Sequence, residues 1–343
     1  MRGPSVSLTT DLWTSSTMEP YITVTTHYIT DTWKLKARVL CTSIMPERHT
    51  AVNIADRLSE IIKERGIVVF CTVHDNASNM NLAMELCEMF PKDLGCTGHT
   101  LQLAIKTGLV LRDVAKAIVA ARRFVGHFRH SALATCALKK WQEQPGIRAY
   151  KLQTDCTVRW KFIFVMLQRL FEERIAVQSV LADETVTKPA VQKSLAMRAS
   201  QWELLEQLIP VLQPLDKATE IMCGELHVGL SFIFPVIFNM ISTTLHVEAS
   251  DLTAVRAFKN TVRQQLETRE SDDLTESIST VARMLDPRFK HLNFIPESKR
   301  DSAQSHLNSL LQDEGEPLAE KGEDVHSEDT VDNEGEPVTG KKA

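Results

Sequence analysis

Two aspartates, Asp11 and Asp75, are the residues of this chain whose surroundings best suit metal-dependent chemistry. Asp11 lies inside the run Thr-Thr-Asp-Leu-Trp, and Asp75 follows a β-branched run at residues 67–73. Carboxylates carried on neighbouring strands can hold two divalent ions about 4 Å apart, which stabilises the attacking and leaving oxygens of a phosphodiester. Both residues are therefore candidate catalytic and metal-ligating groups.

Each aspartate also has a simpler interpretation. Asp11 could be a polar residue on a strand edge, although aspartate is unfavourable inside strands, so a buried one needs a partner or a metal. Asp75 is followed by Asn76 and Ser78, either of which could cap the next helix by accepting its first free amides. Asn76 or Ser78 could cap the helix while Asp75 binds a metal ion or takes part in catalysis.

The first 118 residues show the alternation of an α/β domain. Apolar residues recur at every second position in residues 6–12, 22–28 and 33–41, which predicts three strands, the last two joined as a hairpin through residues 30–32. A helix is expected at residues 50–65 and should end at Gly66. Residues 67–73 predict a strand buried on both faces. Asp75 then lies just past the carboxyl end of a strand, where α/β sheets place their ligands.

Beyond residue 119 the strand signal disappears and helical spacing takes over. Three prolines, Pro210, Pro214 and Pro235, should mark helix ends or kinks. The predicted fold class is therefore α/β plus all-α, with an α/β domain at 1–118, a helical domain at 119–295 and a tail at 296–343. Helices are expected at residues 123–141, 159–181, 190–211, 215–222, 232–247, 252–268 and 271–284.

The tail differs from the rest of the chain in charge. The formal net charge is −5, and residues 313–343 contain eleven acidic and three basic residues, so the preceding part is basic overall. The tail is poor in apolar residues and repeats Glu-Gly-Glu-Pro at 314–317 and 334–337. Such a segment cannot bury enough surface to offset its ordering entropy, so we expect it to be disordered.

Composition narrows the class of protein further. The longest apolar stretches fall short of the roughly 20 residues that span a bilayer, and the N-terminus lacks a signal-peptide core. The seven cysteines are scattered without a Cys-x-x-Cys, which indicates a reducing compartment rather than a disulfide framework. Cys96 and His99 have the spacing of half a metal site, but zinc needs four ligands, so a structural role is expected for both.

Five motifs occur in an order that resembles the hAT-superfamily transposases, in particular the BED-type zinc finger proteins descended from them. The resemblance covers residues 7 to 292, and five motifs in register are specific where one alone would be weak. The motifs are Thr-Asp-Leu-Trp-Thr-Ser at 10–15, His-Asp-Asn-Ala-Ser-Asn-Met at 74–80, Cys-Thr-Gly-His-Thr-Leu-Gln-Leu at 96–103, Thr-Val-Arg-Trp at 157–160 and Leu-Asp-Pro-Arg-Phe-Lys at 285–290.

The resemblance implies a ribonuclease H-like domain interrupted by a large helical insertion. In active members a D, D, E triad binds Mg²⁺ or Mn²⁺, and Asp11 and Asp75 match its first two acids. The resemblance places the third acid and the dimer interface in a later segment that this chain does not reach, and the BED finger before residue 1. We therefore expect an incomplete domain with a vestigial catalytic site. No cofactor is expected unless the site is active, in which case it would be Mg²⁺ or Mn²⁺. The resemblance gives no basis for predicting self-association.

The resemblance also suggests residues that contact DNA. At the positions of Arg159 and Trp160, family members use the arginine on backbone phosphate and the ring on a flipped base. The alternative for Trp160 is a core position, because it opens an apolar helical stripe. Arg122 and Arg123 belong to a basic cluster with His127, Arg129 and His130 that could face phosphates or simply form a solvated helix face.

Three hypotheses follow. The first is a transposase-derived, catalytically inactive nuclear protein that acts by associating with DNA or protein and regulates transcription. The second is a fragment of an active hAT-type transposase with a two-metal D, D, E site. The third, a different ribonuclease H-like nuclease, would need a third carboxylate near Asp11 and Asp75, for which the sequence offers no strong candidate. No membrane association is expected.

Overall fold

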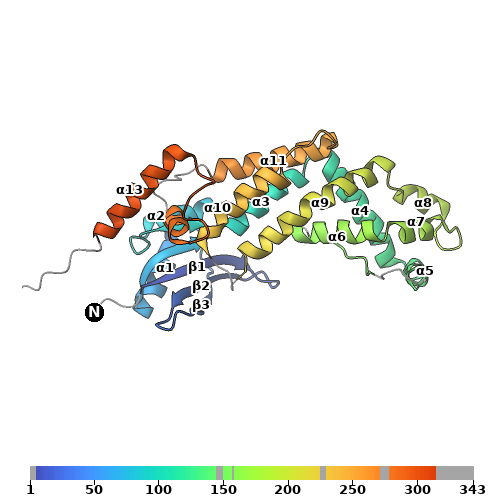
Figure 1. The fold of residues 1–343 in the computed structure, drawn as a ribbon. Coiled ribbons are helices and arrows are strands. Elements are labelled where there is room, and N and C mark those ends of the chain that lie inside the picture. The colour runs from blue at the N-terminus through green and yellow to red at the C-terminus, as the bar shows by residue number, and fades with distance from the viewer. Residues whose placement is uncertain (1–4, 144–149, 157, 225–228, 271–277, 314–343) are drawn as a thin grey trace, which may run out of the picture.

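One mixed sheet lies at the bottom of the view in Figure 1, below most of the helices. The computed structural model describes residues 5–143, 150–156, 158–224, 229–270 and 278–313. The strand order is β3-β2-β1-β4-β5, so β1 is central, and its neighbours run antiparallel on the β2 side and parallel on the β4 side. The strands are β1 (Ser5–Thr14), β2 (Pro20–Ile29), β3 (Leu35–Ile44), β4 (Val68–His74) and β5 (Asp93–Gly95).

One face of this sheet packs against α1 (Ala51–Arg65) and α2 (Ser78–Leu86). Alternate residues of β1 point into this core, as the sequence predicts: Leu8 is 1% exposed. Thr50 caps α1 by accepting from the amide of Asn53, and Gly66 ends the helix in the left-handed region at φ 60°. The hairpin between β2 and β3 is also confirmed, because these strands pair antiparallel.

Strand β4 departs from the prediction. Residues 67–73 were expected to be buried on both faces, but Val68 is 40% and Phe70 47% exposed, so that expectation is wrong at these two positions. Helices α1 and α2 cover one face of the sheet, where Val69 is buried, and Val68 and Phe70 lie outside that core. Strand β5 was not predicted, since three residues are too few to show a period of two.

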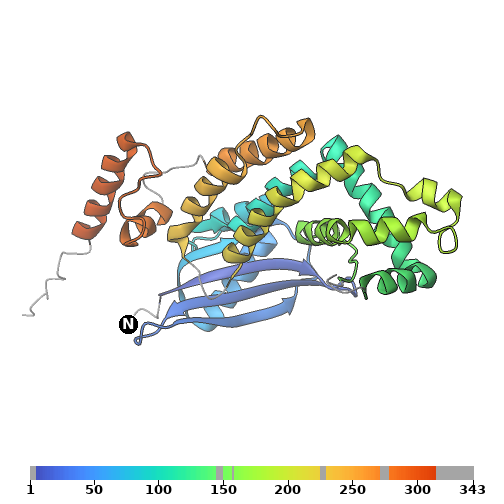
Figure 2. The ribbon, with the colours of Figure 1, turned by 45° about the vertical axis from the view of Figure 1, so that its right-hand side comes forward.

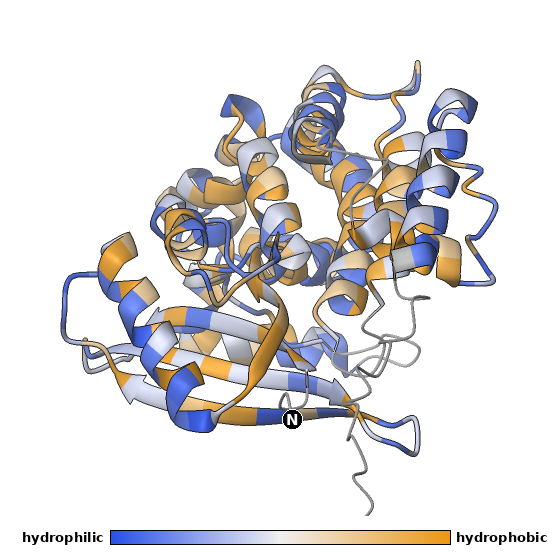
Figure 3. Ribbon diagram, turned by 90° about the vertical axis from the view of Figure 1, so that its left-hand side faces the viewer, coloured by the Kyte–Doolittle hydropathy of each residue, from blue (hydrophilic) through white to orange (hydrophobic). Residues whose placement is uncertain are grey.

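All later elements are helical, and among the described residues no strand follows Gly95, which confirms the helical prediction. Most of the helices extend from the sheet into an elongated body with its own buried core (Figures 1 and 2). Figure 3 shows apolar residues gathered on the helix faces that meet one another. The helices are α3 (Thr97–Leu109), α4 (Arg112–His130), α5 (Ala132–Gln142), α6 (Trp160–Glu172), α7 (Arg174–Ala182), α8 (Pro189–Leu195), α9 (Ala199–Met222), α10 (Leu230–Asn239), the π-helical turn η1 (Met240–Thr244), α11 (Thr253–Glu270), α12 (Ile278–Leu285) and α13 (Glu297–Asp313).

Several helix boundaries differ from the sequence expectation. The helix predicted at 123–141 is broken at Ser131, whose side chain accepts from the amide of Ala134 and so begins α5. Conversely, α9 continues through Pro210 and Pro214, which were expected to separate two helices. Each internal proline costs about 3 kcal/mol, and burial of Leu208, Leu212 and other residues of the same helix face offsets that cost.

The first part of the expected tail is helical. Residues 297–313 form α13 rather than a disordered segment, so the boundary at 296 is wrong in this part. The helix is held by a small core in which Leu292, Ile295 and Ala303 are buried, and by Arg300, which donates to the carbonyls of Leu292 and Ile295. The rest of the predicted tail, residues 314–343, lies outside the described residues. Within the described ranges no helix is long and apolar enough to cross a membrane.

Candidate functional site

Asp11 lies on the face of β1 opposite the α1 and α2 core, near the end of the strand. Its neighbours Thr10 and Leu12 point toward that core, so the alternation of the strand turns Asp11 outward, where it is exposed. Strands β1 and β4 are parallel neighbours with Thr9 opposite Val73. Because parallel strands end at the same edge of a sheet, Asp11 and Asp75 are brought to one edge, and the predicted adjacency of their strands is confirmed.

The backbone at Asp75 is fixed by the residues on either side of it. His74 is buried, and its ring nitrogens contact the carbonyl oxygen of Asp75 at 2.5 Å and the carboxylate of Asp93 at 3.0 Å. The Asp75 carboxylate accepts from the amide of Ala77 at 3.3 Å. Sequence reasoning missed His74 and Asp93, which pack where β5 meets β4, because β5 itself was not predicted.

The predicted capping of α2 by Asn76 or Ser78 is wrong. The N-cap residue of α2 is Ala77, which makes no side-chain cap, and the amide of Met80 in the first turn donates to the side-chain oxygen of Asn79 at 3.1 Å. Asn76 instead donates from Nδ2 to the hydroxyl of Thr100 at 2.6 Å, which links the loop after β4 to α3. The contact is close to Gly95, where a Cβ atom would lie 1.9 Å from the Asn76 side-chain oxygen. Asn76 therefore links the loop after β4 to α3 and does not cap the N-terminus of α2.

Charged residues from distant parts of the chain lie near Asp11 and affect its ionisation. The pKa of Asp11 is raised, first because surrounding protein partly removes the carboxyl group from water and second because the Asp75 carboxylate repels its charge. His99 on α3 and Arg159 at the start of α6 lower the pKa of Asp11, because their positive charge favours the ionised carboxylate. Asp11 is nevertheless exposed to solvent, so a ligand can reach it.

Cys96 and His99, the predicted structural pair, lie at the N-terminal end of α3 beside this site. The amide of Cys96 donates to the carbonyl of His74 at 2.7 Å, which joins α3 to the end of β4. Cys223, just after α9, lies near Cys96: a Cβ atom on Gly98 would be 2.6 Å from the Cys223 sulfur and 3.9 Å from the Cys96 sulfur. The described residues contain no group of three His, Cys, Asp or Glu side chains placed to hold a metal ion.

Arg159 and Trp160 have different positions although they are adjacent in sequence. Arg159 is exposed at the N-cap of α6, within electrostatic range of Asp11. Trp160 is 1% exposed and packs in the helical core beside Phe164. A ring so deeply buried cannot stack on a base in this conformation, so the structure favours the core interpretation of Trp160.

The residues of the predicted basic cluster on α4 also differ in their surroundings. Arg122 forms an ion pair with Asp155, whose side chain is only 4% exposed, so its charge is already compensated inside the protein. Arg123 is exposed and donates to the carbonyl of Ser194 at 3.0 Å. Burial lowers the pKa of His127. Sequence reasoning missed Asp155, since nothing in the sequence relates it to a helix more than thirty residues earlier.

In a comparison with known protein families, the sequence matches two family models that follow one another along the chain. Residues 9–100 match the model of the ZBED1 RNase-like domain, and residues 94–210 match that of the ZBED1 RNase-like helical domain. The first match contains both Asp11 and Asp75. The second contains Arg122, Arg159 and Trp160.

Curated relatives cover most of the chain at low identity. Zinc finger BED domain-containing protein 4 of Homo sapiens is 21% identical over 89% of this chain, and protein 6 of the same name and organism is 24% identical over 87%. The putative AC transposase of Zea mays is 24% identical over 64% of the chain. The chain spans 26%, 32% and 28% of these three proteins, so about a quarter to a third of each. Together with the ordered motifs and the mixed sheet followed by helices, these matches show that the chain belongs to the hAT-type transposase-derived proteins.

Proposed function

We propose that this chain acts in the nucleus by associating with DNA, as a regulator of transcription, and that its own residues do not cleave DNA strands. The fold behind this proposal is ribonuclease H-like, with Asp11 and Asp75 as the two remaining acids of an ancestral site. The similarity to BED zinc finger proteins and to a transposase supports a DNA-associated role.

The observation that carries the proposal is the composition of the sheet-edge site. Two carboxylates, Asp11 and Asp75, lie on neighbouring strand ends, with Arg159 and His99 close enough to act on the charge of Asp11. A phosphate group suits this mixture, because Arg159 can pair with it directly while the carboxylates repel it unless a cation intervenes. The site therefore has the chemistry to meet a nucleic-acid backbone.

The same site offers too few ligands for strand cleavage. Mg²⁺ is commonly held by one or two carboxylates together with water and substrate phosphate, so Asp11 and Asp75 fit one hydrated ion. When bound, such an ion would neutralise charge on a phosphate oxygen. Cleavage by the two-metal route requires a second ion held in line with the scissile bond. No third carboxylate joins the pair among the described residues.

The test separates association from cleavage. Wild-type protein should bind a labelled DNA oligonucleotide in a fluorescence-anisotropy titration, with affinity that falls as salt is raised. Incubated with supercoiled plasmid and Mn²⁺, it should produce no more nicked circle than the Asp11→Ala, Asp75→Ala double variant. Absence of DNA binding at low salt would refute the proposed association.

A second candidate function is that of a catalytic piece of an active transposase. It is favoured by the placement of both matched acids at one sheet edge and by the similarity to the maize protein. This candidate predicts metal-dependent nicking that either single change, Asp11→Ala or Asp75→Ala, abolishes. Such a result would replace the inactive assignment.

A further inference from the structure

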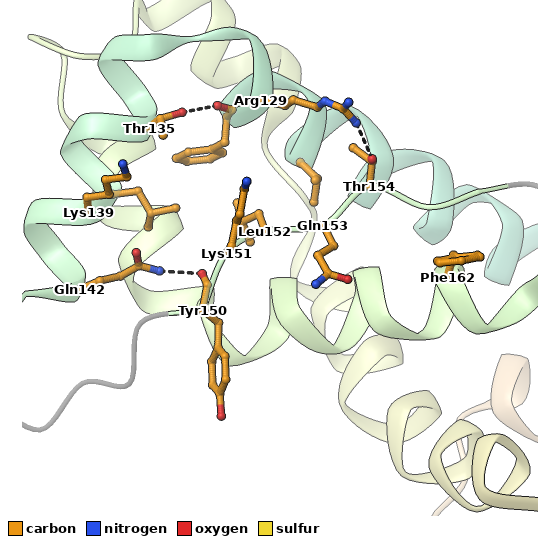
Figure 4. Close-up of a pocket in the computed structure, with 13 residues that line it drawn as sticks. Arg129, Thr135, Lys139, Gln142, Tyr150, Lys151, Leu152, Gln153, Thr154 and Phe162 are labelled. Atoms are coloured by element: carbon orange, nitrogen blue, oxygen red, sulfur yellow. Dashed lines mark hydrogen bonds between the residues drawn. The ribbon is translucent and has the colours of Figure 1, made fainter. Parts of the chain in front are cut away.

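A cavity of about 960 Å³ opens in the helical body, away from the sheet edge (Figure 4). Its walls come from the end of α4, from α5, from residues 150–154 and from the first turn of α6. The volume lies within the range of pockets that bind small molecules or parts of polymers. Arg129, a member of the basic cluster predicted on α4, lines it, whereas Arg122, Arg123, Arg159 and Trp160 do not.

Among the described residues that line this cavity, three are cationic and none is acidic. Arg129 comes from α4, Lys139 from α5 and Lys151 from the segment before α6, and all three are exposed. Arg129 donates to the hydroxyl of Thr154 at 2.7 Å, which orients its guanidinium. Within the described part of the chain, no ion pair to a carboxylate involves any of the three. Their charge is therefore available to an anionic ligand.

The wall between these cations is apolar. Leu138 and Leu152 line it near Lys139 and Lys151, and Phe162 lines its far end on α6, with a side chain that is 42% exposed although it follows the buried Trp160 by only two residues (Figure 4). Cationic groups that follow a backbone, combined with an exposed aromatic ring on which a base can stack, are what proteins use to bind single-stranded nucleic acid. A duplex keeps its bases stacked inside and offers nothing to such a wall.

The cavity is connected to the sheet edge through a short stretch of chain. Thr154 lines the cavity, and Arg159, five residues later, acts on the charge of Asp11. Five residues span at most about 18 Å. Between them, Asp155 is held by Arg122, and the carbonyl of Val158 accepts from Gln102 on α3. One strand of a few nucleotides could thus lie against both places.

We propose that the cavity binds a single-stranded segment of nucleic acid, with its phosphates on Arg129, Lys139 and Lys151 and a base against Phe162, and that it extends the sheet-edge site along the same strand. This proposal rests on the proposed function, since it assumes that the chain associates with DNA. It adds the form of nucleic acid that is recognised and the residues that recognise it.

Charge removal tests the phosphate contacts. The full chain carrying Lys139→Gln and Lys151→Gln should bind a labelled single-stranded oligonucleotide about tenfold more weakly at about 0.15 M salt. The plot of log K against log salt should also become less steep, by about 0.7 for each phosphate contact that is lost. The control removes equal charge from exposed lysines outside the cavity, Lys140→Gln and Lys188→Gln, and should leave affinity and slope unchanged.

Removal of the ring tests stacking separately. Phe162→Ala should weaken binding roughly tenfold while leaving the salt slope unchanged, because stacking is not ionic. The matched control is Phe238→Ala on α10, where the ring is 45% exposed and outside the cavity. Thermal melting of each variant shows that it is folded before its affinity is compared.

Four outcomes would overturn the proposal. Equal losses in both lysine double variants would indicate a diffuse charge effect, and unchanged binding of the cavity variants alongside normal wild-type binding would refute the cavity while leaving the proposed function intact. Tighter binding of a duplex or of a glutamate-rich peptide at the cavity would assign it another occupant. Failure of the wild-type chain to bind any oligonucleotide would refute both proposals together.

Discussion

Replacing Arg122 with glutamine should destabilise the protein far more than the same change at the adjacent Arg123. In the structure, Nε of Arg122 donates to both carboxylate oxygens of Asp155, at 2.9 and 3.1 Å, and Nη2 donates to one of them at 2.5 Å. These hydrogen bonds also raise the pKa of Arg122. The change would leave the Asp155 carboxylate enclosed by protein without its cation.

The expected magnitude follows from the exposure of the two partners. Breaking a fully buried pair costs about 3–5 kcal/mol, whereas an exposed pair contributes about 0–1 kcal/mol. The Asp155 side chain is 4% exposed and that of Arg122 is 40% exposed, so the pair is intermediate. We expect Arg122→Gln to lower the free energy of unfolding by about 2–3 kcal/mol. Arg123→Gln should change it by less than about 0.5 kcal/mol, because its contact with Ser194 is exposed.

Urea unfolding followed by tryptophan fluorescence measures this difference. Trp160 and Trp202 are 1% and 3% exposed in the helical core, so they report on the part of the protein that the ion pair supports. A double-mutant cycle with Asp155→Asn separates the pair from other effects of either change. Similar losses for Arg122→Gln and Arg123→Gln, or a coupling energy near zero, would refute the assignment of Arg122 to a structural role.

Two further predictions concern the packing of α3 and the charge of the sheet edge. Gly108→Ala should cost about 1–3 kcal/mol in urea unfolding, because the new Cβ would lie 2.6 Å from the Phe258 ring, whereas Gly126→Ala has open space and should be neutral or stabilising. Equal costs would contradict the packing argument. Asp11→Asn should raise the melting temperature at pH 7, since the raised pKa means that the ionised carboxylate is less favourable in the folded chain near Asp75 than in the unfolded chain. That gain should disappear as the pH falls below the ordinary carboxyl pKa, where wild-type Asp11 is protonated in both states, and a gain that persists there would refute the electrostatic cause.

The sheet was largely predictable because period-two alternation reports directly on which face is buried. Leu8 and Ile22 follow it and are 1% and 0% exposed. What covers the second face is a tertiary property, so the apolar run of β4 could not reveal that Phe70 is exposed. Helix boundaries failed for a similar reason. Burial along α9 outweighs the local preference of Pro210 and Pro214 to end a helix.

The candidate site was predictable only in part. Motif order and strand character were enough to bring Asp11 and Asp75 to one edge, because the pairing of parallel strands fixes where their ends meet. The roles of the arginines could not be predicted from the sequence. Arg122 and Arg123 are equivalent in sequence, yet about 100° of helix rotation separates them, and only Arg122 meets Asp155. The same reasoning explains Trp160, whose position in the core depends on what packs around α6.

The segment that begins at Tyr150 runs from the cavity toward the sheet edge. Its first amide donates to the buried Glu173, Asp155 is paired with α4, and the carbonyl of Val158 accepts from α3. These bonds tie the described residues of the segment to α4, to α3 and to Glu173, which lies between α6 and α7. Arg159, which completes the segment, is within electrostatic range of Asp11. The residues that line the cavity at 150–154 therefore belong to the same stretch of chain as the cation beside the sheet-edge carboxylates.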